Sequence, residues 1–132
     1  MILALKTSDS TTHLALYDPA AYTKPAAEVT WESGRQLADQ LLSRIDELLA
    51  ARPEAQQTLT GIVIFSGPGS FTSLRIGHTV ANALADSLNI PVASAKGDNW
   101  IHQAIASLAS THTGHFALPF YGAEANVTKP KP

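Results

Sequence analysis

The sequence contains no cysteine. A disulfide framework, a thiolate zinc site, an iron–sulfur cluster and a cysteine nucleophile are therefore excluded for this chain. A chain without cysteine is compatible with a reducing compartment, and we expect a cytoplasmic protein.

Positive charge and long apolar runs are also scarce. Nine Lys and Arg residues stand against 11 Asp and Glu, which gives a formal net charge of −2. Autonomous binding to nucleic acid is disfavoured, because that affinity depends mainly on Lys and Arg meeting phosphates.

No run approaches the roughly 18 apolar residues of a membrane helix, and the start MILALKTSDS does not resemble a signal peptide. We expect no membrane contact and, at 132 residues, one packed domain.

Short apolar runs separated by turn residues predict the strands. Two runs at the start flank the polar stretch 7–11, which predicts a β-hairpin. A third run follows a loop with two prolines, and the unbroken run Gly61–Phe65 predicts a strand buried on both faces. The predicted strands span residues 1–6, 12–17, 29–31, 61–65 and 90–94.

The clearest helical pattern covers residues 33–51, where Leu37, Leu41 and Ile45 recur every four residues and Leu42 lies on an adjacent stripe. One stripe can cover a sheet while the other faces a second helix or another chain, and the periodicity does not decide between them. Further helices are predicted over 71–88 and 99–108. Strands and helices that alternate after an antiparallel start predict an α/β fold with a mixed sheet of about five strands.

A glycine-rich turn joins the buried strand to the second helix. A helix that opens there points unpaired N–H groups at one place, which favours an anion site. Ser70 or Thr72 can cap this helix, and Arg75 lies one turn inside it. Alternatively, Gly67 and Gly69 only permit a tight turn, while Ser70 caps the helix and Arg75 has a structural role. The spacing is that of neither a Walker loop nor a dinucleotide fingerprint.

Small residues recur along the same helix. Gly77, Ala81 and Ala85 form a flat stripe that lets another backbone approach closely, and His78 and Asn82 lie one position further round. Polar groups beside such a stripe favour a specific contact with a partner. Packing of the helix on its own sheet would use the same stripe, so both interpretations stay open.

The sequence does not support a metal or catalytic site. The histidines show no H-E-x-x-H motif and no pair at i and i+4. No G-x-S-x-G elbow is present, so Ser70 is a poor candidate nucleophile, and paired carboxylates are missing from the expected loop ends. We therefore expect no metal site and no catalytic residue. The histidines are His13, His78, His102, His112 and His115.

The string GPGSFTSLRIG, from Gly67 to Gly77, and the opening ILALKTS resemble the TsaB (YeaZ) family. The resemblance covers about residues 1–109, and PFYG at 119–122 is similar to the family's C-terminal P-x-Y segment. It implies an ASKHA-like lobe, the fold of actin, hexokinase and the heat-shock ATPases, over 1–109. It also implies an extended tail over 110–132, and so a short form of the family without most of the second lobe.

Two positions depart from the family pattern. Lys6 stands where the family usually has aspartate, the residue that helps organise metal and phosphates in ATP-using relatives. A lysine ammonium cannot ligate Mg²⁺. Ser73 replaces a usual glycine, so the backbone there need not approach a ligand as closely. We therefore expect no cofactor to be bound by this chain alone, with ATP and Mg²⁺ used by the complex.

The resemblance implies a non-catalytic subunit that pairs with the TsaD catalytic subunit and helps to recruit the ATPase TsaE. That machinery installs threonylcarbamoyl on the adenosine beside the anticodon of tRNAs that read codons beginning with A. It also implies contact with tRNA only through the complex, and a possible homodimer when alone. The implied partner surface comprises Leu37, Leu41, Leu42, Ile45, Gly77, His78, Ala81, Asn82 and Ala85, and the loop near the active site of the complex comprises Gly67, Gly69, Ser70, Thr72 and Arg75.

Other functions stay open beside this one. A small nucleotide phosphohydrolase would use the loop from Gly67 to Arg75. A peptidase, a label sometimes attached to relatives of the family, lacks both a nucleophile elbow and metal-ligand spacing. An α/β module with a different partner is the third alternative.

Overall fold

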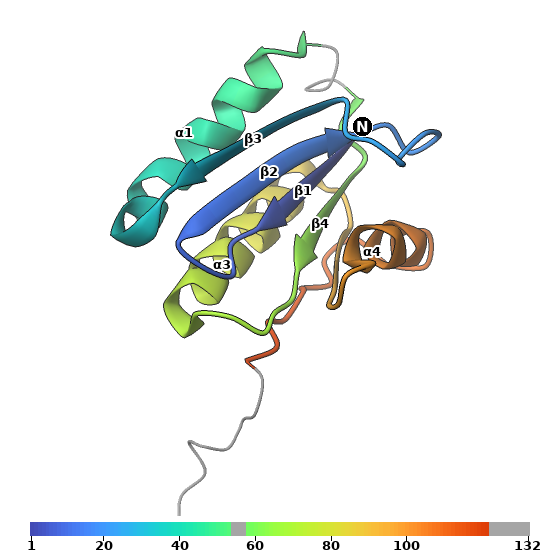
Figure 1. Cartoon of the computed structure of the whole chain (residues 1–132). Coiled ribbons are helices and arrows are strands. Elements are labelled where there is room, and N and C mark those ends of the chain that lie inside the picture. The colour runs from blue at the N-terminus through green and yellow to red at the C-terminus, as the bar shows by residue number, and fades with distance from the viewer. Residues whose placement is uncertain (54–57, 122–132) are drawn as a thin grey trace, which may run out of the picture.

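The computed structural model describes residues 1–53 and 58–121. Its described part contains a mixed five-stranded sheet in the order β3-β2-β1-β4-β5 (Figure 1). The predicted α/β fold is therefore confirmed, and each predicted strand is present with its ends shifted by at most two residues. The strands are β1 (Ile2–Lys6), β2 (Thr11–Tyr17), β3 (Ala27–Glu32), β4 (Gly61–Phe65) and β5 (Val92–Ala95).

The direction of the strands brings distant loops together. β2 is antiparallel to both β1 and β3, whereas β4 is parallel to β1 and to β5. The carboxyl ends of β1, β4 and β5 therefore meet at one edge of the sheet, which we call the carboxyl edge. Ligands of open α/β sheets bind at such an edge. The turn after β1 and the glycine loop after β4 both lie there.

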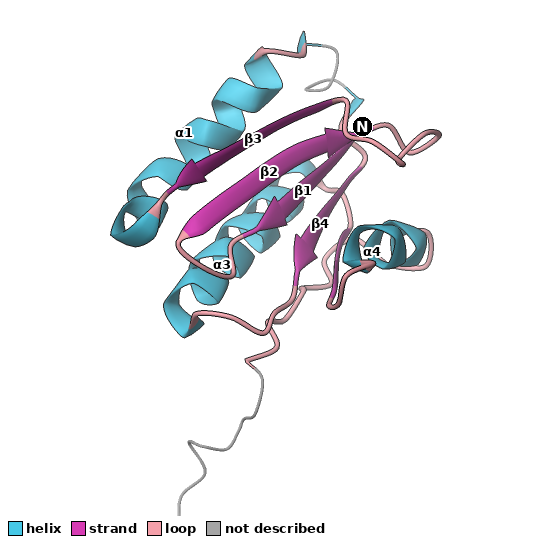
Figure 2. Ribbon diagram, viewed as in Figure 1, coloured by secondary structure: helices cyan, strands magenta, loops and turns pink. Residues whose placement is uncertain are grey.

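Helices cover both faces of the sheet (Figure 2). α1 (Leu37–Ala50) and α3 (Phe71–Leu88) pack on one face, in a core with the leucines and isoleucines of the central strands. α4 (Trp100–Leu108) packs on the other face, where Trp100, Ala104 and Ile105 contact β4 and β5. No helix within residues 1–53 or 58–121 is long and apolar enough to cross a membrane.

The first helix begins later than the sequence predicts. Gly34–Gln36 form a 3₁₀ turn (η1), and α1 starts at Leu37. The hydroxyl of Ser33 is not a helix cap, because it lies 2.7 Å from the Thr12 hydroxyl and donates to the Ser10 carbonyl at 3.2 Å. These bonds hold the chain against the β1–β2 hairpin until the helix begins.

The segment after α4 returns to the carboxyl edge. Asn82 of α3 donates to the Ala117 carbonyl at 2.9 Å and accepts from the Ala117 N–H at 2.8 Å. The N–H of Phe120 then donates to the carbonyl of Ser66 at 2.6 Å. Residues 117–121 thus lie along α3 and the glycine loop. Residues 122–132 of the predicted tail lie outside the described part. The division into a lobe and a tail stays a prediction.

Candidate functional site

The glycine loop is packed against the chain's own backbone. A Cβ on Gly69 would meet the Ser8 carbonyl oxygen and lie 2.9 Å from the Ser8 Cα, and the N–H of Ser70 donates to that carbonyl at 2.7 Å. Gly67 has a φ of +122°, and a Cβ there would meet the Phe120 carbonyl. Both glycines therefore make room for neighbouring backbone. This agrees with the second interpretation of the sequence, in which the glycines permit a tight turn and do not form an anion site.

Ser70 begins the second helix. Its hydroxyl accepts from the Ser73 N–H at 3.4 Å, so Ser70 is the N-cap and Thr72, the other candidate, is not. Thr72 is exposed, and Arg75 is exposed with its guanidinium 5.5 Å from the centre of the Phe71 ring. Phe71, Thr72 and Arg75 are thus exposed side chains of this segment, while the hydroxyl of Ser70 is used within the helix.

The small-residue stripe faces the sheet. A Cβ on Gly77 would run into the side chain of Thr7, and Ala81 and Ala85 belong to the core that α1 and α3 share with the sheet. The prediction that Gly77, Ala81 and Ala85 contact a partner is therefore wrong. The glycine is required because α3 crosses β1 closely at this point.

Most of the predicted surface on α1 is also core. Leu37, Leu41 and Ile45 are at most 1% exposed, because this stripe packs on the sheet. Their predicted contact with a partner is corrected for that reason. Leu42, on the adjacent stripe, is 56% exposed and remains available.

The polar pair on α3 is used inside the chain. Asn82 holds Ala117 by its two bonds, and His78 is 3% exposed. The Nδ1 of His78 lies 2.8 Å from the Leu74 carbonyl, which can only accept, so Nδ1 carries the proton. The buried Nε2 has no hydrogen-bond partner among the described residues. The predicted partner contact of His78 is corrected because its side chain is buried within the chain. The partner contact of the half-buried Asn82, which binds the returning segment, stays a prediction.

His78 gives the folded state a pH dependence. Burial lowers the pKa of the imidazole in the folded protein. The unfolded chain, in which His78 keeps its ordinary pKa, then binds a proton more readily than the folded protein. The folded state therefore keeps its full stability above that ordinary pKa and loses stability as the pH falls below it.

We expect the unfolding temperature to fall less between pH 7 and pH 5 in His78→Gln than in the unchanged chain. The exposed His112→Gln is the control; equal slopes for all three proteins in a thermal melt would contradict the assignment.

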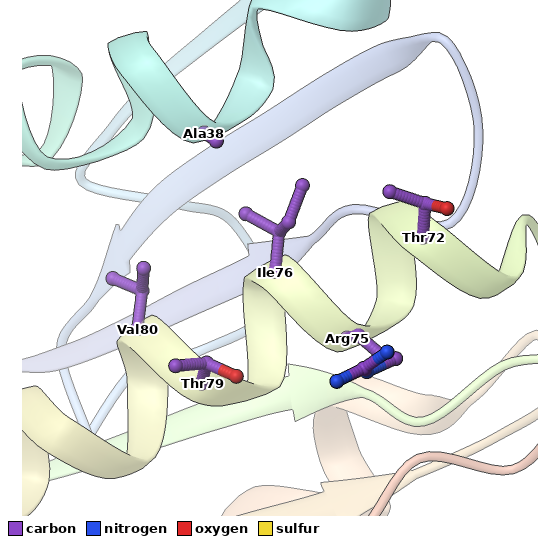
Figure 3. Close-up of a pocket in the computed structure, with 6 residues that line it drawn as sticks. All are labelled: Ala38, Thr72, Arg75, Ile76, Thr79 and Val80. Carbon is purple, nitrogen blue, oxygen red and sulfur yellow. The ribbon is translucent and has the colours of Figure 1, made fainter.

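A groove runs between α1 and α3 on the outer side of these two helices. One hollow of about 370 Å³ is lined by Ala38 of α1 and by residues of the first turns of α3 (Figure 3). A second of about 350 Å³ includes Leu42. Both share Thr79 and Val80, so they form one continuous surface, the α1/α3 groove. Its lining residues are Ala38, Leu42, Thr72, Arg75, Ile76, Thr79, Val80, Ala83, Leu84 and Ser87.

The sequence contains a pattern that indicates the groove. Ile76, Val80 and Leu84 recur every four residues, one position before Gly77, Ala81 and Ala85. Two neighbouring stripes of one helix cannot both lie flat on a sheet. The larger apolar stripe beside the small residues is the one that lines the groove.

The carboxyl edge does not fit a magnesium–nucleotide site. The Nζ of Lys6 lies 4.7 Å from the centre of the Phe65 ring, so a cation occupies the end of β1. Mg²⁺ takes oxygen ligands, chiefly carboxylates. Within residues 1–53 and 58–121, no group of three or more His, Asp or Glu side chains is placed to hold a metal ion. Asp9, which follows β1, accepts instead from the N–H of Thr11 at 2.9 Å.

Comparisons with known proteins agree with this geometry. A family model described as "TsaD: tRNA N6-adenosine threonylcarbamoyltransferase" matches residues 29–96. The "tRNA threonylcarbamoyladenosine biosynthesis protein TsaB" of Bacillus subtilis is 37% identical over 93 residues, 70% of this chain and 39% of the relative. The Haemophilus influenzae protein of the same name is 31% identical over 91 residues, 69% of this chain and 37% of the relative.

Solved structures give the same result. YeaZ from Pseudomonas aeruginosa superimposes with a TM-score of 0.63 at 30% identity, over 72% of this chain and 43% of that one. A second structure, described as an uncharacterized protein with similarity to peptidase YeaZ from Pseudomonas aeruginosa, has the same TM-score and identity, over 72% of this chain and 42% of its own.

The mixed sheet with helices on both faces and a glycine loop at its carboxyl edge defines an ASKHA-type lobe. Within that class, the chain belongs to the TsaB (YeaZ) family. It spans about two fifths of the length of the curated relatives it matches, 39% and 37%.

Proposed function

We propose that the chain is a non-catalytic partner subunit in tRNA threonylcarbamoyladenosine biosynthesis, and that it binds and positions a TsaD-like catalytic subunit. Membership of the TsaB family supports the pathway. The pairing is supported above all by the largely apolar α1/α3 groove, whose open side the chain itself leaves uncovered.

The groove is suited to helices of a partner. Ridges of side chains on one helix pack into grooves on another, and apolar ridges give most of the free energy. Leu42 and Val80 provide apolar surface, while Thr79 and Ser87 add small polar groups along the same path. A pair of partner helices laid along α1 and α3 would cover this surface. In the absence of the catalytic subunit, the same groove would serve a homodimer.

The loop from Gly67 to Arg75 is proposed to lie near the active site of the complex, where a TsaE-like ATPase docks. Thr72 and Arg75 are among the exposed side chains that such a neighbour would contact. Gly67, Gly69 and Ser70 would fix the shape of the loop through their contacts with Phe120 and Ser8.

Nucleotide chemistry is assigned to the complex. Lys6 at the end of β1 supports the view that this chain alone binds no ATP, so ATP and Mg²⁺ would be used by the other subunits. The complex, which we place in the cytoplasm, would also provide most of the tRNA contact, in keeping with the chain's net charge of −2.

The enzymatic alternatives have less support. A phosphohydrolase needs room for phosphates at the glycine loop, and that room is taken by Ser8 and Phe120. For a peptidase, the word in the name of one structural relative, the described residues offer no metal-ligand cluster, and Ser70 serves as a helix cap. An accessory subunit needs neither a phosphate-binding site nor a catalytic centre of its own.

Reconstitution tests this function directly. The catalytic and ATPase components are mixed with tRNA, ATP, Mg²⁺ and an activated threonylcarbamoyl donor, with and without this chain, and threonylcarbamoyladenosine is measured by mass spectrometry. We expect modification only when the chain is present. Equal modification in its absence, with every component folded, would refute the proposal.

A further inference from the structure

Three aromatic rings and two cations form two groups beside the glycine loop, and the groups meet at the consecutive residues Phe120 and Tyr121. The Nζ of Lys96 lies 3.8 Å from the centre of the Phe120 ring. The ring of the next residue, Tyr121, is 4.6 Å from that of Phe71, and the Arg75 guanidinium is 5.5 Å from Phe71 on the same helix. Because these residues come from α3, the end of β5 and the returning segment, only the fold assembles them. We call Phe71, Arg75, Lys96, Phe120 and Tyr121 the aromatic row.

The row is open to solvent and carries positive charge. Phe71 is 55% exposed, Tyr121 40% and Phe120 39%. Within the part of the chain that the structure describes, neither Lys96 nor Arg75 forms a salt bridge. Exposed rings beside uncompensated cations favour a ligand that has both flat aromatic surface and negative charge.

A small pocket adjoins one end of the row. It has a volume of about 210 Å³, and Arg75 and Tyr121 line both the pocket and the row. His78 also lines it, and the buried Nε2 of His78 is an acceptor without a donor among the described residues. A buried acceptor of this kind costs free energy unless a ligand or water supplies an N–H or O–H.

We propose that the aromatic row binds unpaired nucleotides of an RNA strand. Bases stack on the exposed rings, phosphates meet Lys96 and Arg75, and the pocket beside Arg75 and Tyr121 receives the edge of a base. An acidic peptide would use the two cations and leave the rings without a flat partner, so RNA fits the row better. The inference rests on the proposed function only in naming tRNA as the source of the strand, and the affinity of the chain alone is modest because its net charge is −2.

The test uses the full chain and a fluorescein-labelled single-stranded RNA of ten nucleotides in fluorescence anisotropy at about 50 mM salt. Tyr121→Ala should weaken binding about five-fold or more, while Tyr121→Phe, which keeps the ring, should bind as the unchanged chain does. Lys96→Gln should weaken binding and reduce the slope of log K against log salt by about 0.7. Lys24→Gln is the matched control, because Lys24 is exposed on the β2–β3 connection, at the opposite edge of the sheet (Figure 1).

Several outcomes would overturn the inference: no saturable binding, equal affinity of Tyr121→Ala and the unchanged chain, or binding of a hexaglutamate peptide in place of RNA. The unchanged chain is assayed both for RNA binding and for pairing with the TsaD-like subunit, to separate this proposal from the previous one. Intact pairing without RNA binding would refute the aromatic row alone. RNA binding without pairing would refute the proposed function alone.

Discussion

Replacing Leu42 with glutamate is expected to abolish association with the TsaD-like subunit while leaving the chain folded. The side chain is 56% exposed and lines the α1/α3 groove, so a partner helix would cover it. A carboxylate buried there would lose its hydration without gaining a partner cation, which costs several kcal/mol. We expect the affinity to fall at least about 100-fold, as measured by the elution of the mixed proteins in size-exclusion chromatography.

Ser43→Glu is the matched control for this change. Ser43 is exposed on the same helix but does not line the groove, so the same charge is added outside the proposed interface. Circular dichroism should show equal helicity in both variants, because glutamate is a good helix former. Loss of pairing in both variants, or in neither, would argue against the groove as the interface. Leu41→Glu cannot replace this test, since Leu41 is fully buried and its change would unfold the chain.

The Gly69→Ala variant is expected to destabilise the fold by about 2–4 kcal/mol. The added methyl would meet the carbonyl oxygen of Ser8 and lie 2.9 Å from its Cα, and backbone in a hairpin turn cannot move aside as a flexible side chain can. Movement of the turn would also break the bond from the Ser70 N–H to Ser8. Urea unfolding followed by circular dichroism measures the loss.

Gly34→Ala provides the comparison. Gly34 has a φ of +50°, and a Cβ there would meet nothing within 4 Å, so the change costs only the strain of the left-handed backbone, about 1–2 kcal/mol. If Gly69→Ala were as stable as the unchanged chain, the loop would have spare room. The alternative interpretation, in which the glycine loop forms an anion site for a phosphate, would then regain support.

The sequence predicted the elements of this fold well, because each depends on local patterns. An unbroken apolar run marks β4, and four-residue spacing marks α1 and α3. The sequence could not predict which face of each helix packs on the sheet. Leu41 and Leu42 are neighbours of the same type, yet one is buried and the other exposed. That difference arises because Leu41 packs in the core with residues of the sheet that are distant in sequence, whereas Leu42 lies beside α3 at the groove.

The candidate site was predictable only in part. The glycine loop and its Ser70 cap follow from local residue types. Its tight packing does not, because Ser8 and Phe120 reach the loop from opposite ends of the described chain. Asn82, a polar residue in the middle of an apolar helix, was a visible clue to the returning segment that it binds at Ala117.

Hydroxyl-radical footprinting by mass spectrometry tests the central claim, that the α1/α3 groove is the surface covered by the catalytic subunit. Leu42 and Phe116 are 56% and 57% exposed, and only Leu42 lines the groove. Adding the TsaD-like subunit at micromolar concentration should sharply reduce oxidation of Leu42 and leave oxidation of Phe116 unchanged. Unaltered oxidation of Leu42, with both proteins folded and mixed, would contradict the account.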